Sequence, residues 1–315
     1  MQKIVKFICG RIYDDYKRPY GGTPMTVKCI RDAFKDDEDY TVVAIERTAF
    51  DNVNFVESIK EFRSRADIFH VDDTGILETM YRNKMKPPDV IGPISRGPLK
   101  NYKGWRSAYS ADWFYKATVI RLNYSEEYNN KIDARDKIVL IRHGIDTDLI
   151  CTGPSIERKY VLWAGDQARF AKNFELFQDI MKITKLPPPY EYKIISKYNV
   201  QDYWDILDET AILVNTSKYE SFCCALFEAK AKGVPTIYRE FLHDYFKIGN
   251  FYRDSEIQVE YTAEAYRTKI LALLECPSLI DHYGKKNREY VLENATLRIM
   301  RDDMKKVYNE VIKDG

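Results

Sequence analysis

The feature that most constrains the fold of this chain is an alternation of short β-rich runs with helical patterns, which occurs twice. In the first half, strands are predicted at residues 3–10, 40–46, 66–72, 88–95 and 137–146. Helical patterns separate the first four of these runs. Such an order is typical of a parallel sheet covered by helices.

The periodicity is lost over residues 147–159, which carry Gly and Pro, and the alternation then restarts at residue 160. The second half has predicted strands at 160–165, 211–217 and 234–238, predicted helices at 172–184 and 223–232, and two long helical patterns at about 262–275 and 286–312. We therefore expect two doubly wound α/β domains that face each other across a cleft. Their bounds are predicted at 1–150 and 160–315, with a linker at 151–159.

Composition narrows the class of protein further. The chain has 315 residues, a length that suits two domains, and 49 basic against 48 acidic residues. This balance gives no global attraction to a polyanion. The six cysteines form no C-x-x-C pair and only four histidines are present, so no metal site is predicted. No apolar run has the length of an integral membrane segment, and the N-terminus lacks a secretory pattern. These features predict a cytoplasmic protein without a cofactor.

The stretch "YESFCCALFEAKAKGVP" (219–235) places Glu220 and Glu228 at the two ends of an apolar segment. It follows a predicted strand directly, and ligands of open α/β sheets bind beyond the carboxyl ends of strands. The amides of Phe222–Cys224 would begin the next helix and form a phosphate site. Glu228, inside that helix, can accept two hydrogen bonds from a vicinal diol such as a ribose. Glu220 stays in the loop.

This stretch resembles the Glu-x7-Glu motif of retaining glycosyltransferases with the GT-B fold, most closely those of glycosyltransferase family 4. The matching positions are Ser217, Glu220, Ser221, Phe222, Glu228, Ala229, Ala231, Gly233 and Pro235. Cys223 departs from the pattern, because the family has a glycine there. The resemblance implies that Glu220 contacts the donor sugar, that Glu228 holds the ribose, and that Ser221, Phe222 and Cys223 line the donor site.

Two other segments extend the resemblance. "GDQARFAKN" (165–173) is similar to the family segment whose arginine and lysine hold the donor diphosphate. Lys172 occupies the lysine position, but Asp166 stands where the arginine belongs, and Arg169 could supply the guanidinium from a shifted position. "YGGTP" (20–24) resembles the glycine loop of the first domain, in which Gly21 and Gly22 would approach the donor closely.

The first domain resembles the family more loosely. Many members carry a catalytic histidine after the fourth strand, and "DVIGPISRGPLKN" (89–101) has none. The nearest candidate is His70, at the end of an earlier strand. The resemblance also implies that the final helix crosses back onto the first domain.

A basic and aromatic segment at 96–121 contains Lys100, Lys103, Trp105 and Arg106. Six basic residues stand there against one acidic residue, so the local charge is 6 − 1 = +5. One interpretation is an amphipathic helix half buried on the first domain. The other is a contact with an acceptor or with a membrane surface.

The sequence supports three hypotheses of unequal weight. The first is a retaining, metal-independent glycosyltransferase that uses a UDP- or GDP-sugar and acts in the cytoplasm, with peripheral contact at the inner membrane surface. Its acceptor stays open among lipid, glycan, protein and modified nucleic acid. The second is a catalytically degenerate GT-B module that binds nucleotide-sugar or glycan. A Rossmann dehydrogenase is disfavoured because no G-x-G-x-x-G follows a predicted strand, and no P-loop motif is present either.

Overall fold

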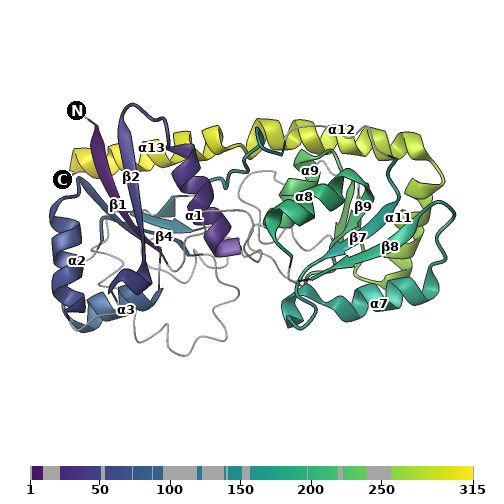
Figure 1. Ribbon diagram of the computed structural model, residues 1–315, viewed down its shortest axis with the longest axis horizontal. Coiled ribbons are helices and arrows are strands. Elements are labelled where there is room, and N and C mark those ends of the chain that lie inside the picture. The colour runs from purple at the N-terminus through teal and green to yellow at the C-terminus, as the bar shows by residue number, and fades with distance from the viewer. Residues whose placement is uncertain are drawn as a thin grey trace. The chain divides into compact units, whose positions relative to one another are not determined.

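The computed structural model describes residues 2–9, 22–50, 54–72, 74–86, 88–94, 119–122, 138–139, 141–150, 157–196, 198–218, 223–239 and 257–314. These residues form two compact α/β units (Figure 1). The first unit contains the described residues up to Gly144 together with the C-terminal helix that begins at Leu297. The described residues from Ile145 to Thr296 form the second unit.

The first unit is built on a parallel sheet with the strand order β2-β1-β3-β4-β5-β6. Its strands are β1 (Lys3–Cys9), β2 (Tyr40–Glu46), β3 (Ile68–Asp72), β4 (Val90–Ile94), β5 (Val119–Leu122) and β6 (Ile138–Val139). The helical elements between them are α1 (Gly22–Ala33), η1 (Arg47–Phe50), α2 (Phe55–Ser64) and α3 (Thr74–Arg82). Strand β1, which lies between β2 and β3, buries Val5, Phe7 and Cys9 in the core of this unit.

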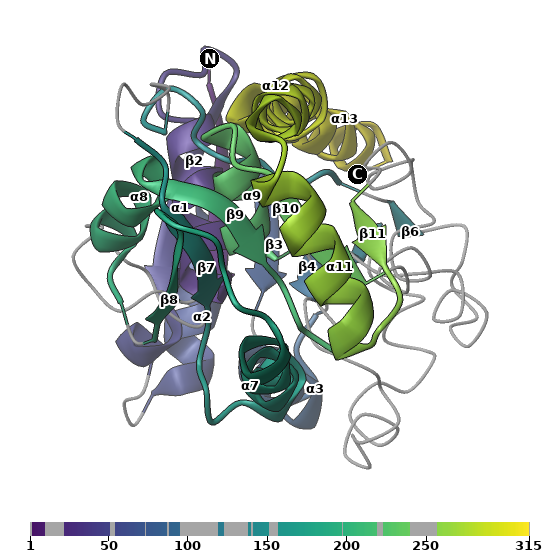
Figure 2. The same cartoon turned by 90° about the vertical axis from the view of Figure 1, so that its right-hand side faces the viewer.

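The second unit has a parallel sheet with the order β11-β10-β9-β7-β8. Its strands are β7 (Tyr160–Ala164), β8 (Glu191–Ile195), β9 (Thr210–Val214), β10 (Thr236–Arg239) and β11 (Gln258–Val259). Its helices are η4 (Phe170–Lys172), α7 (Phe174–Ile183), α8 (Val200–Asp208), α9 (Cys224–Ala231), α11 (Ala263–Leu274) and α12 (Pro277–Asn294). Figure 2 shows α8 and α9 on one side of this sheet and α7 and α11 on the other.

The local sequences explain why these elements are buried. Strand β9 reads TAILV without polar alternation, and all five residues are buried, as expected for a parallel strand with both faces covered. Helix α9 is also buried all round rather than along one stripe. The predicted fold class, two doubly wound parallel α/β units, is confirmed.

The C-terminal helix α13 (Leu297–Asp314) packs on the first unit, next to α1 (Figure 1). Its buried face carries Met300, Met304, Val307, Tyr308 and Val311, at spacings of three and four residues. The prediction that the final helix crosses back to the first domain is therefore confirmed.

The prediction of one long helix over 286–312 is wrong, because α12 ends at Asn294 and α13 begins at Leu297. The break is held by a segment distant in sequence. The Ile145 amide donates to the Ala295 carbonyl at 2.7 Å, and Ile145 also forms a β-bridge with Thr296.

Among the described residues, no helix is both long and apolar enough to span a membrane.

Candidate functional site

The strand order of the second unit reverses at β7, which lies between β8 and β9. In doubly wound sheets this reversal sends the connections after the two neighbouring strands to opposite faces, and ligands bind beyond the carboxyl ends at that point. The relevant loops follow β7, over residues 165–173, and β9, over residues 215–223. Both carry residues that the sequence motifs single out.

The loop after β7 presents Lys172 and Arg169. A short 3-10 turn, η4, holds Lys172, whose amide donates to the Arg169 carbonyl at 2.8 Å. The Lys172 side chain is half-buried and that of Arg169 is exposed. Gly165 makes room for the Trp163 ring, since a Cβ there would lie only 3.1 Å from it, while Cγ of Lys172 would be in ordinary contact at 3.5 Å.

Hydrogen bonds fix this loop to the end of β9. The Thr216 hydroxyl donates to the Lys172 carbonyl at 3.0 Å and accepts from the Trp163 indole at 2.9 Å. The Lys218 amide donates to the Ala171 carbonyl at 2.7 Å. Lys172 therefore has a defined position relative to the β9–α9 loop, which is the arrangement that a preorganised site needs.

A second set of polar residues supports the same loops and was not found from the sequence. The Tyr261 hydroxyl donates to the Thr216 carbonyl at 2.9 Å and accepts from the Asn173 amide group at 2.5 Å. Arg239, at the end of β10, lies over the Tyr261 ring at 4.2 Å and donates to the Lys218 carbonyl at 3.4 Å. The motif pattern stops at Pro235, so it gave no signal for these residues.

Cys223 precedes α9 in the left-handed conformation, with φ 56° and ψ 66°. An L-residue pays about 1–2 kcal/mol for this conformation, whereas glycine adopts it freely. The side chain is 7% exposed, and its Sγ accepts from the Asn215 amide group at 3.2 Å. Cys223 thus stands in the backbone conformation that explains the glycine of the resembled motif.

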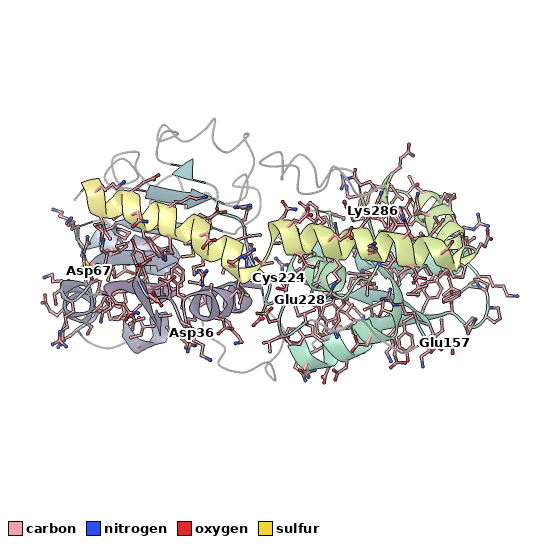
Figure 3. All side chains as sticks on the ribbon, turned by 90° about the horizontal axis from the view of Figure 1, so that it is seen from above. Asp36, Asp67, Glu157, Cys224, Glu228 and Lys286 are labelled. Carbon is pink, nitrogen blue, oxygen red and sulfur yellow. The ribbon has the colours of Figure 1, made fainter. Side chains whose placement is uncertain are left out.

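Glu228 lies inside α9, and Figure 3 shows it with Cys224 on this helix. Its residue is only 1% exposed. The neighbouring helix α8 contributes Tyr203, whose hydroxyl donates to the Ala225 carbonyl at 2.6 Å. Burial raises the pKa of Tyr203 well above its ordinary value, and the charges of Tyr198 and Glu228 add to this. The carboxylate of Glu228 therefore lies within electrostatic reach of α8.

The same helix buries a second charged residue, Lys230, which is 2% exposed. Its ammonium lies 5.9 Å from the ring centre of Phe227, 5.3 Å from that of Tyr238 and 5.4 Å from that of Tyr290. Burial lowers the pKa of Lys230 to about 7, although the nearby Cys223 thiol acts in the opposite direction. Nothing in the motif pattern pointed to this residue.

The structure thus anchors two of the predicted donor residues, Lys172 and Cys223, to the end of β9, and buries Glu228 on the following helix. Gly22 is the first residue of α1 in the first unit. The remaining predicted contacts lie outside the described residues: Gly21, Lys100, Lys103, Trp105, Arg106, Glu220, Ser221 and Phe222. In the described part of the chain, no group of three or more His, Cys, Asp or Glu residues is arranged to hold a metal ion.

His70 lies in the core of the first unit and is fully buried. Its Nδ1 is 3.1 Å from the Tyr308 hydroxyl, and its ring meets Phe7 edge-on with a centroid distance of 4.6 Å. These contacts suit a packing role, and a catalytic role for His70 stays a prediction.

No protein-family model and no curated protein sequence matches this chain. Solved structures are similar to it over almost its whole length. Sucrose-phosphate synthase from Thermosynechococcus elongatus has 14% identity and a TM-score of 0.73, with 100% of both chains covered. An alpha-glucosyltransferase in complex with UDP and a 13-mer DNA has 11% identity and a TM-score of 0.67, covering 98% of this chain and 100% of that one. HepE from Anabaena, in complex with UDP and glucose, has 12% identity and a TM-score of 0.66, with 97% and 99% covered. The chain therefore has the GT-B fold of these glycosyltransferases.

Proposed function

We propose that this protein is a retaining, metal-independent glycosyltransferase that uses a nucleotide-diphosphate sugar. The observation that carries the proposal is the placement of Lys172 and Cys223 at the β7/β9 switch point, next to a helix that buries Glu228. A cation, a helix start and an internal carboxylate can recognise a diphosphate joined to a ribose.

In this proposal Glu228 accepts hydrogen bonds from the ribose diol, and Lys172 with Arg169 binds the diphosphate in place of a metal ion. Glu220 orients the donor sugar, and Cys223 narrows the space for it. The bond between the anomeric carbon and the β-phosphate oxygen breaks, and an acceptor oxygen bonds to that carbon on the same face. The acceptor proton passes to the leaving phosphate, whose charge the cations stabilise.

We favour UDP over GDP as the nucleotide, because two structural neighbours were solved with UDP. The acceptor is left open among lipid, glycan, protein and modified nucleic acid. The proposal places the enzyme in the cytoplasm and assigns the basic segment that contains Lys100, Lys103, Trp105 and Arg106 to acceptor or peripheral membrane contact. Charge reversal of Lys100, Lys103 and Arg106 should then weaken binding to acidic vesicles or change acceptor use.

Titration calorimetry with UDP, GDP and ADP, followed by hydrolysis assays with the matching glucose nucleotides in EDTA, tests the proposal. We expect UDP to bind most tightly and Glu228→Gln to weaken it by about tenfold or more, because hydrogen bonds to a charged acceptor are lost. The matched control is Glu191→Gln, on the exposed first residue of β8. Unchanged UDP affinity in Glu228→Gln would refute the assignment.

One observation favours a second candidate, a GT-B module that binds a nucleotide-sugar without transferring it. Asp166 occupies the position of the expected arginine, and its carboxylate accepts from the Ala168 amide at 3.0 Å. The position therefore brings a negative charge to the loop that should hold a diphosphate. Measurable UDP binding without hydrolysis or transfer from any UDP-sugar would support this candidate over the first.

A further inference from the structure

Phe170 is the most exposed of the large apolar side chains in the described part of the chain, at 71%. It lies in η4, between Arg169 and Lys172, at the carboxyl end of β7. An exposed phenylalanine forgoes the free energy that burial of its ring would contribute. Because Phe170 lies beside the proposed donor site, its exposed ring is in a position to contact a ligand.

Loop disorder does not account for this exposure, because the turn that carries Phe170 is fixed on both sides. The Lys172 amide donates to the Arg169 carbonyl at 2.8 Å, and the Lys218 amide donates to the Ala171 carbonyl at 2.7 Å. The Thr216 hydroxyl adds a bond to the Lys172 carbonyl at 3.0 Å. The ring is thus presented from a braced turn, which suits a binding surface.

The ring also carries a cation. The ammonium of Lys218, from the β9–α9 loop, lies 3.5 Å from the Phe170 ring centre. This cation–π contact joins the two loops of the switch point and holds the lysine in place. Phe170 and Lys218 together form an apolar ring with a positive charge over one of its faces, which we call the Phe170–Lys218 platform.

The chemistry of the Phe170–Lys218 platform selects its ligand. An exposed aromatic ring stacks on another ring, and lysine only donates hydrogen bonds. A neutral sugar presents hydroxyls, which are best bound by groups that also accept. An oxyanion beside a ring matches both parts of the platform. Nucleic acid would use several stacking rings along a basic groove, and Phe170 is the only described aromatic among the exposed large apolar residues.

We propose that the Phe170–Lys218 platform binds the acceptor, and that the acceptor is a sugar bearing an oxyanion, a phosphate or a carboxylate. The face of the Phe170 ring opposite Lys218 stacks on the apolar face of the sugar ring, and Lys218 pairs with the oxyanion. This inference rests on the proposed function, because it assigns the neighbouring Lys172 and Glu228 to the donor. It extends that function by naming the class of acceptor and two residues that determine it.

Saturation-transfer NMR titrations of the UDP-saturated protein with glucose 6-phosphate, glucuronate and glucose test this proposal. We expect one or both of the anionic sugars to bind at least about tenfold more tightly than glucose. Phe170→Ala should weaken them by about tenfold, and Lys218→Gln should bring them to the level of glucose. The two anionic probes distinguish a phosphate from a carboxylate.

The matched controls are Leu292→Ala, at another exposed apolar residue, and Lys182→Gln, at an exposed lysine. Neither should change binding of the sugars. Equal binding of glucose and both anionic sugars, or wild-type binding by Phe170→Ala, would overturn the proposal. So would displacement of the sugars by a single-stranded oligonucleotide whose own binding depends on Phe170. UDP affinity is measured separately in each variant, so a failure of the donor assignment shows independently of the acceptor result.

Discussion

Helices α13 and α9 handle charge in opposite ways. Helix α13 buries one face and keeps its charged residues along the edges of that face. There the Arg142 guanidinium makes two hydrogen bonds to the Asp303 carboxylate, at 2.7 and 2.8 Å, and Lys305 pairs with Asp37 at 3.1 Å. Helix α9 is buried all round and encloses Glu228 and Lys230.

The difference separates two uses of a charged side chain. At this edge, the cations Arg142 and Lys305 stay partly exposed to water, so an ion pair attaches the helix at little cost. Inside a core, each charge loses its hydration, and the loss is only partly recovered from neighbouring groups. Burying two charged residues in one short helix therefore costs folding free energy that the fold itself does not require. We attribute this cost to ligand binding for Glu228, while Lys230 has no assigned role.

The largest effect is expected for Lys230→Met, which removes the buried ammonium and keeps an unbranched side chain. Burial lowers the pKa of Lys230 from 10.5 to about 7. A difference of that size corresponds to several kcal/mol. Between about pH 7 and about pH 10.5 the unfolded chain binds this proton and the folded protein does not, so the free energy of unfolding rises with pH.

The wild-type penalty is therefore largest at or below pH 7. Lys230→Met should stabilise the protein by several kcal/mol at pH 6 and by much less at pH 10, as measured by urea unfolding. Lys232→Met is the matched control, since Lys232 pairs with Asp208 at 2.7 Å and its loss should destabilise the protein. If Lys230→Met changed the free energy of unfolding equally at both pH values, the cost of burying Lys230 would not come from its positive charge.

The next effect concerns how α9 is held. Gly284 of α12 lies against the loop that follows α9, and a Cβ at Gly284 would come within 2.2 Å of the Gly233 carbonyl oxygen. Gly284→Ala must separate the two segments and should cost about 2–3 kcal/mol of unfolding free energy. Lys285→Ala, at the exposed next residue, should change stability little. Similar thermal denaturation curves for the two variants would contradict this close packing.

The strands and the site illustrate what a sequence can predict. Strand β9 and helix α9 were predictable because their apolar runs and the spacing of Glu228, Gly233 and Pro235 are local patterns. The break between α12 and α13 was not, because it depends on the Ile145 amide, 150 residues from Ala295 in sequence. The helical pattern of apolar residues continues through this break, so the sequence alone gives no sign of it.

Supporting residues are harder to predict than motif residues. Tyr261 and Arg239 stabilise the loops of the site by donating hydrogen bonds to backbone carbonyls. Every residue has such a carbonyl, so these bonds depend on where the two side chains lie in space and leave no pattern in the sequence. Phe170 lay inside a recognised segment, yet only the structure shows that its ring is exposed and capped by Lys218. Phenylalanine side chains are usually buried, so an exposed phenylalanine in a binding site can be found only from the three-dimensional structure.

A smaller effect is expected at the edge of α13. Burial by itself would raise the pKa of Asp37, but hydrogen bonds from Lys305 and from the amides of Tyr40 and Asp39 outweigh it and lower the pKa. This stabilisation is present above pH 3.8 and is lost as the pH falls through the lowered pKa. Lys305→Met should cost about 1–2 kcal/mol at pH 7 and less near pH 3.

Guanidinium unfolding at the two pH values measures the difference. Lys306→Met is the control, because Lys306 is exposed and only loosely paired with Asp303, at 3.4 Å. A loss in Lys306→Met as large as that in Lys305→Met would mean that the edge of α13 contributes by general charge and not by this pair.

The smallest effect is expected at the start of α9, where Cys223→Gly and Cys223→Ala together isolate the cost of the left-handed backbone. Both variants lose the contact between Sγ and the Asn215 amide group, so that loss cancels when they are compared. Alanine keeps the strain at φ 56° and glycine does not, whereas glycine gains more entropy on unfolding. We expect Cys223→Gly to be more stable than Cys223→Ala by about 1 kcal/mol in urea unfolding. The same pair tests the site: if Cys223 restricts the donor sugar, both variants should accept bulkier UDP-sugars in hydrolysis assays. If only the glycine variant does so, backbone strain rather than the side chain shapes the pocket.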